Sequence, residues 1–227
     1  MIKSISMLHG CAAAALIATM SLSGSALAAP QRILLETQKG TLTALNGSGA
    51  TGTISMQLRG QRYLTVQIDA TGLEPGTGHV GHIHGRVADN RPANSVCPTT
   101  AQDADRDRFV ELAEGLVTYG PIVIPFGDVD PDKDGTVHFL HTYDLNASST
   151  FAAGFDKSDV LPLDLREVVL HGMTLQAGEG ATTSASIAPN EADGTAGFKA
   201  VLPVTCGDIE DRGRNPLEFV RPPHHSH

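Results

Sequence analysis

The sequence predicts an all-β fold, an antiparallel Greek-key β-sandwich or barrel with long loops. Short segments rich in Thr, Val and Ile alternate apolar and polar residues with a period of two. Turn-forming pairs such as Asn46-Gly47 and Asp134-Gly135 separate them, and only residues 106–115 are a candidate helix. The expected strands are 41–45, 53–58, 63–69, 116–126, 136–143, 166–173, 184–188 and 198–204, with another at the His-rich run 79–85.

Residues 1–28 have the pattern of a secretory signal peptide. Lys3 precedes a short apolar stretch, and Ala26-Leu27-Ala28 provides a small-residue cleavage site. The apolar stretch is shorter than the roughly 20 residues that a membrane-spanning helix needs. We therefore expect an exported protein, periplasmic or extracellular, without a membrane span. A β-sandwich domain over 32–209 and a flexible, His-containing tail over 210–227 would follow.

The charge of the chain argues against a nucleic-acid partner. Lys and Arg number 16 against 25 Asp and Glu, and aromatic residues make up only 4% of the sequence. A nucleic-acid interface needs a basic face and aromatic side chains on which bases stack. Protein partners are not specified by this composition, so a metal ion is the one partner that the sequence motifs suggest.

Two cysteines, Cys97 and Cys206, remain once the signal peptide is removed. In an oxidising compartment such a pair is most simply a disulfide. Two free thiols or a pair of thiolate metal ligands are the alternative. A disulfide here would join a loop in the middle of the chain to a segment near its end.

The grouping of the histidines points to a metal site. His82 and His84 are two residues apart on an expected strand, so their side chains share one face. His171 lies near the end of another expected strand, and three imidazoles from two strands suit copper, or else zinc. The alternative is that these are hydrogen-bonded strand histidines that hold no metal. His79 and His138 are reserve candidates for a supporting role or a fourth ligand.

An acidic loop has the ligand spacing of a calcium-binding EF-hand loop. Positions 1, 3, 5, 9 and 12 of the twelve-residue motif are acidic: Asp103, Asp105, Asp107, Glu111 and Glu114. We take Asp103, Asp105, Asp107 and Glu114 as the candidate calcium ligands. Position 6, which is glycine in the motif, is Arg108 here, so a solvated acidic loop is the alternative. Calcium, if bound, would order this loop.

The chain resembles the copper/zinc superoxide dismutases. Gly78-His79-Val80-Gly81-His82-Ile83-His84 is similar to the family's copper strand, whose pattern is His-Gly-Phe-His-Val-His. Residues 73–76 resemble the turn before that strand, and residues 128–135 resemble a hairpin turn of the family. Residues 168–171 resemble the strand with the last copper histidine, and residues 204–207 resemble the segment of the second disulfide cysteine. The similar segments occur in the family's order.

This resemblance implies copper bound by His82, His84 and His171. Zinc is not expected at the family's usual site, because residues 85–137 contain no histidine. Pro203 stands where the family keeps an arginine that guides superoxide, and a net negative protein does not steer an anion well. The resemblance therefore implies an exported copper-binding protein that dismutes superoxide weakly or buffers copper, and whether it is an enzyme stays open.

A second resemblance is to the CHRD domain, a secreted β module. His82-Ile83-His84-Gly85 and the later segment 119–125 are similar to two of its strands. This resemblance implies a similar β-sandwich with a non-catalytic binding or structural role, stabilised by calcium if the acidic loop binds it. The segment Gly120-Pro121-Ile122-Val123-Ile124 favours the CHRD resemblance, whereas the cysteine pair and the His171 strand favour the dismutase-like alternative.

Overall fold

The computed structural model describes residues 34–130, 132–181 and 191–210, although not the side chains of residues 208 and 210. The predicted signal peptide, the predicted strand 184–188 and residues 211–227 of the predicted tail lie outside these ranges, whereas residue 210 belongs to a strand. The strands are β1 (Leu35–Ala44), β2 (Thr51–Arg59), β3 (Tyr63–Thr71), β4 (Val80–Ala88), β5 (Arg91–Ala93), β6 (Ile122–Asp128), β7 (Thr136–Asp144), β8 (Arg166–Leu175) and β9 (Gly197–Glu210). The helices are α1 (Leu112–Tyr119) and α2 (Lys157–Val160), with 3₁₀ turns at Thr100–Gln102, Ser148–Thr150 and Leu163–Leu165.

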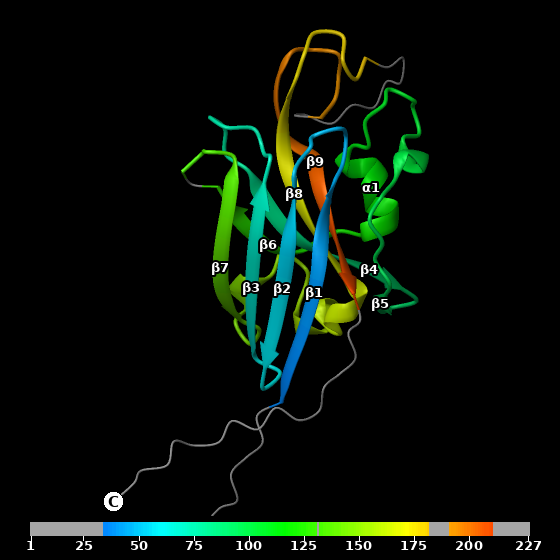
Figure 1. The fold of residues 1–227 in the computed structure, drawn as a ribbon. Coiled ribbons are helices and arrows are strands. Elements are labelled where there is room, and N and C mark those ends of the chain that lie inside the picture. The colour runs from blue at the N-terminus through cyan, green and yellow to red at the C-terminus, as the bar shows by residue number, and fades with distance from the viewer. Residues whose placement is uncertain (1–33, 131, 182–190, 211–227) are drawn as a thin grey trace, which may run out of the picture. The chain divides into compact units, whose positions relative to one another are not determined.

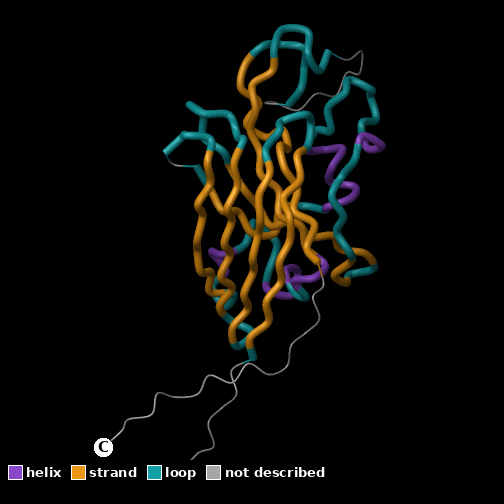
Figure 2. Tube along the Cα trace, in the orientation of Figure 1, coloured by secondary structure: helices purple, strands orange, loops and turns teal. Residues whose placement is uncertain are grey.

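The strands form one antiparallel sheet system, which confirms the predicted all-β class. Hydrogen-bonded neighbours follow the order β5-β4-β8-β9-β1-β2-β3-β7, and β6 pairs with β4. Figure 1 shows β7, β3, β2 and β1 side by side, and Figure 2 shows that the helices are short segments beside the strands. Among the described strands β6 and β7 do not pair, so the sheet does not close into a barrel. No helix in the described part of the chain is long and apolar enough to cross a membrane.

The core follows from the alternation in the sequence. In β2 and β3 every second side chain is buried: Ile54, Met56, Leu58, Leu64, Val66 and Ile68. The two strands pair in a register that places Ile54 opposite Ile68 and Leu58 opposite Leu64. Apolar residues therefore collect on one face of the sheet, where their removal from water stabilises the fold.

The segment that follows residue 111 differs from the prediction. A strand over 116–126 is wrong at its start, because Leu112–Tyr119 form helix α1 and β6 begins only at Ile122. At the N-terminus of α1 the main-chain N–H of Glu111 donates to the Glu114 carboxylate. At the other end Gly120 has φ of 82°, a left-handed conformation that favours glycine and ends a helix.

The predicted helix over 106–115 is also wrong in its first half. Residues 106–111 form no helix and bend at 107 and 108, and α1 begins only at Leu112. Here aspartate carboxylates accept main-chain N–H groups that a helix would use internally: Asp103 accepts from Asp107 and Arg108, and Asp107 accepts from Phe109. Upstream, β4 extends to Ala88 and the short strand β5 pairs with its end, so the loop that leads to α1 begins only after Ala93.

A disulfide joins Cys97 to Cys206, with the two Cα atoms 5.7 Å apart. This confirms the predicted pairing and removes free thiols as an alternative. Cys206 is in β9, so the bridge attaches the loop before α1 to this strand. Here Tyr119 of α1, Val169 and Cys206 form a small buried cluster, separate from the main core.

Candidate metal centre

The three predicted metal-binding histidines lie on two neighbouring strands. Strands β4 and β8 pair antiparallel, with His82 opposite Val169 and Val80 opposite His171. Ile83 and Leu170 belong to the main core, so alternation directs their neighbours to the opposite face. His84 and His171 are 0% and 1% exposed, and His82 is half-buried.

The three imidazoles converge. Ring centroids are 4.9 Å apart for His82 and His171, 5.6 Å for His82 and His84, and 5.9 Å for His84 and His171. One ring nitrogen from each residue lies within 4.8 Å of the other two. Two ligands bound to one metal at about 2.0–2.1 Å are at most about 4.2 Å apart. Even if all three nitrogens are 4.8 Å apart, shifts of less than about 1 Å would place them around one ion.

Main-chain carbonyls orient two of these rings. The Nδ1–H of His84 donates to the carbonyl oxygen of Gly120 at 2.8 Å, and the Nδ1–H of His171 donates to that of Val201 at 2.7 Å. A carbonyl oxygen only accepts, so Nδ1 carries the proton and Nε2 keeps its lone pair in both rings. A carbonyl contact of this kind is typical of histidines that bind metals.

Within this cluster three buried ring nitrogens have no hydrogen-bond partner among the described residues. They are Nδ1 of His82, Nε2 of His84 and Nε2 of His171. A buried polar atom without a partner costs about 1–3 kcal/mol. Three such atoms on converging rings indicate a site whose unused lone pairs are directed toward a shared ligand.

Burial keeps all three rings neutral. It lowers the pKa of His82 to about 4 and that of His84 to about 3, because the charged imidazolium is disfavoured away from water. For His171, burial and then the neighbouring His82 and His84 hold the pKa well below its usual value. Neutral imidazole is the form that binds a metal ion.

Helix α1 covers His84 through Tyr119. The two ring centroids are 4.4 Å apart, and the Tyr119 hydroxyl donates to the carbonyl oxygen of Leu112 at 3.2 Å. Gly115 makes room for this ring, since a Cβ there would lie 2.4 Å from Tyr119. Sequence reasoning missed Tyr119, because it predicts this segment to be a strand.

The reserve histidines lie elsewhere. The ring of His79 is buried, with Nε2 2.9 Å from the carbonyl oxygen of Glu74 and Nδ1 3.2 Å from that of His171. It thus contacts the main chain beside the three-histidine cluster without pointing a nitrogen into it. His138 is exposed on β7 and contacts Asp69 of β3 at 3.1 Å, so the structure does not group it with the cluster.

The acidic loop forms a second group of oxygens. One set comprises Asp103, Asp105 and Glu114, and the other comprises Asp105, Asp107 and Glu111, with donor atoms in each set within 4.8 Å. Burial, the neighbouring Glu114 and then the other acids raise the pKa of Glu111 to about 9. Burial is also the largest cause of the raised pKa of Asp107. Glu111 was not among the predicted ligands, although its position in the motif was acidic.

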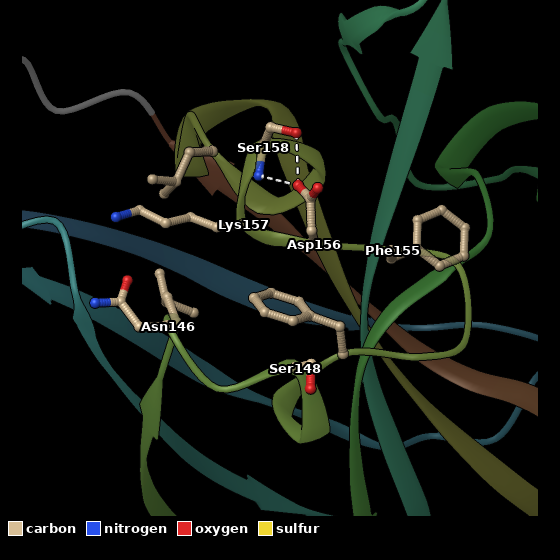
Figure 3. Close-up of a pocket in the computed structure, with 9 residues that line it drawn as sticks. Asn146, Ser148, Phe155, Asp156, Lys157 and Ser158 are labelled. Atoms are coloured by element: carbon tan, nitrogen blue, oxygen red, sulfur yellow. Dashed lines mark hydrogen bonds between the residues drawn. The ribbon is translucent and has the colours of Figure 1, made fainter.

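Two other features of the described residues, a group around the disulfide and a pocket beside α2, do not resemble a metal site. Cys97, Glu167 and Cys206 are close together, but both sulfurs are used in the disulfide. An open pocket of about 600 Å³ lies beside α2 (Figure 3), and none of the three clustered histidines lines it. In it the Asp156 carboxylate already accepts from the main chain and the hydroxyl of Ser158.

Comparison with known proteins adds no assignment: no family model matches the chain, and no curated protein matches it. The class of protein that fold and site define is therefore a disulfide-linked, antiparallel β protein with a cluster of three converging histidines.

Proposed function

We propose that this chain is an exported copper-binding protein whose ligands are His82, His84 and His171. The observation that supports this most is the convergence of three buried, unpartnered ring nitrogens. The carbonyl oxygens of Gly120 and Val201 hold two of these rings in the tautomer that a metal needs. A bound ion would use all three lone pairs and remove the cost of leaving them unpaired.

The ligand set favours copper over other biological cations. An all-imidazole set is a poor match for calcium or magnesium, which prefer oxygen. Between the two metals that suit imidazole, the general order of affinity places Cu²⁺ above Zn²⁺. Since His82 is only half-buried, it is the side from which an ion can enter the site.

Copper holding is better supported than fast superoxide dismutation. The chain carries a net charge of −9, which repels an anionic substrate. Lys199 lies on β9 next to β8, but this residue is only 5% exposed and its ammonium group pairs with Asp193. This lysine therefore supplies no free positive charge to guide an anion. We infer a copper buffer or carrier, with dismutation as a weak side activity of the same site.

Copper titration of the purified metal-free chain tests the proposal. We expect one equivalent of Cu²⁺ to bind, with an electron paramagnetic resonance spectrum that shows coupling to imidazole nitrogens. His84→Gln should weaken binding at least about tenfold, since it removes a ligand. His141→Gln, an exposed histidine on β7, is the matched control and should bind as the unmodified chain does. Binding that persists in His84→Gln would contradict the assignment.

A superoxide assay on the copper-loaded chain separates the two roles. Bound copper with little activity selects buffering, whereas activity well above that of free copper selects dismutation. A chain that binds no copper leaves the CHRD-like, non-catalytic module as the better candidate.

A further inference from the structure

The acidic loop before α1 contains more negative charge than its surroundings compensate. Five carboxylates occur within twelve residues, at the positions 103, 105, 107, 111 and 114. The three ion pairs found in the described part of the chain lie elsewhere and involve none of these acids. The two arginines within the loop, Arg106 and Arg108, are exposed.

Two of the acids are buried. Asp107 and Glu111 are each 6% exposed, and both belong to the group that also contains Asp105. One oxygen of Asp107, Oδ1, accepts the main-chain N–H of Phe109 at 2.8 Å. The other, Oδ2, is buried and has no hydrogen-bond partner among the described residues. A buried carboxylate oxygen of this kind needs a cation or a donor to offset its lost hydration.

The loop makes the turn of the EF-hand motif although position 6 is Arg108 and not glycine. In the EF-hand loop the glycine at position 6 makes a sharp turn. Arg108 occupies that position here with φ of 80°, so the chain makes the turn with an arginine. The carboxylate of Asp103 accepts the N–H groups of Asp107 and Arg108 and holds this conformation.

We propose that this loop binds one Ca²⁺ ion through Asp103, Asp105, Asp107, Glu111 and Glu114. Asp105 belongs to both oxygen groups and lies at their junction. Calcium takes six to eight oxygens in flexible geometry, and five carboxylates, some of them bidentate, supply that number. Magnesium is a poorer match, because it demands a near-ideal octahedron and keeps several waters.

The acidic loop and the histidine cluster differ in the ligand atoms that they offer. The loop offers oxygen where the histidines offer nitrogen, so the two sites select different ions. It lies at the start of α1, the helix whose Tyr119 covers His84. A calcium ion here would tie the loop to the first turn of that helix.

Calorimetric titration of the full, metal-free chain with CaCl₂ tests the proposal. We expect one equivalent with a dissociation constant of about 10⁻⁴–10⁻³ M, the range of extracellular calcium modules. The thermal unfolding midpoint should rise in millimolar calcium, and equal magnesium should have a much smaller effect. His84→Gln should bind calcium unchanged, so failure of the copper proposal and failure of this one are distinguishable.

Substitutions locate the ion. Asp105→Asn should weaken calcium binding at least about tenfold, because it removes charge shared by both oxygen groups. Asp107→Asn is the second variant, and its amide can still accept the Phe109 N–H, so it should fold. Asp132→Asn changes an exposed acid between β6 and β7; it is the control and should not alter binding. No calcium-dependent heat, or equal weakening in the control, would overturn the proposal.

Discussion

Acid should destabilise the metal-free protein through its buried histidines. His82 and His84 have folded-state pKa values of about 4 and about 3, below the ordinary value near 6.5. The unfolded chain therefore binds protons first as the pH falls. Their contribution to stability is complete above pH 6.5 or so and is lost as the pH falls toward the folded-state values.

The magnitude follows from the size of the shifts. Lowering the pH from 7.5 to 5 protonates each histidine in the unfolded chain but not in the folded one. At about 1.36 kcal/mol for each pKa unit, the loss is about 2 kcal/mol for each histidine. Glu111 acts in the opposite direction, because its pKa of about 9 lies above the ordinary value and favours the folded state in acid. The total fall therefore mixes both effects, and only a comparison between variants isolates the histidines.

Urea unfolding at pH 7.5 and pH 5, in the presence of a chelator, measures the effect. His84→Gln removes one titrating ring, and its side-chain amide can still donate to the Gly120 carbonyl. Its stability should fall by about 2 kcal/mol less than that of the unmodified chain between the two pH values. His141→Gln, on the exposed face, is the control and should behave as the unmodified chain does. Equal falls in all three proteins would refute the reasoning about burial.

Three further predictions follow from packing and covalent structure. Cys97→Ser combined with Cys206→Ser should lower the free energy of unfolding by about 2–5 kcal/mol, measured by urea unfolding, because the bridge spans a sequence separation of 109. Gly115→Ala should cost about 1–3 kcal/mol and perturb the NMR signals of the Tyr119 ring, since a Cβ would lie 2.4 Å from it; unchanged signals would contradict the packing. Leu170→Ala, at a fully buried core site, should cost about 2–5 kcal/mol in the same unfolding assay, whereas a change within about 0.5 kcal/mol would place Leu170 outside the core.

Local sequence patterns predicted most of the sheet but misassigned α1. Strands β2 and β3 alternate apolar and polar residues over their whole length, and an alternating pattern of this length indicates a β-strand. The eight residues of α1 are too few for periodicity to distinguish a helix from a strand. The contact of Tyr119 with Gly115 and the turn at Gly120 decide that segment, and both depend on how it packs on β4 and β9.

The sequence by itself determined that His82 and His84 face the same way, because a strand alternates its side chains whatever lies around it. It also determined the acidic spacing of the loop and the supply of two cysteines for one bridge. Only the tertiary structure decided that His171 joins the other two histidines, since this depends on the register between β4 and β8, which are distant in the chain. It also decided which ring nitrogens keep free lone pairs and which acids are buried, because carbonyl groups and neighbours from other segments set both.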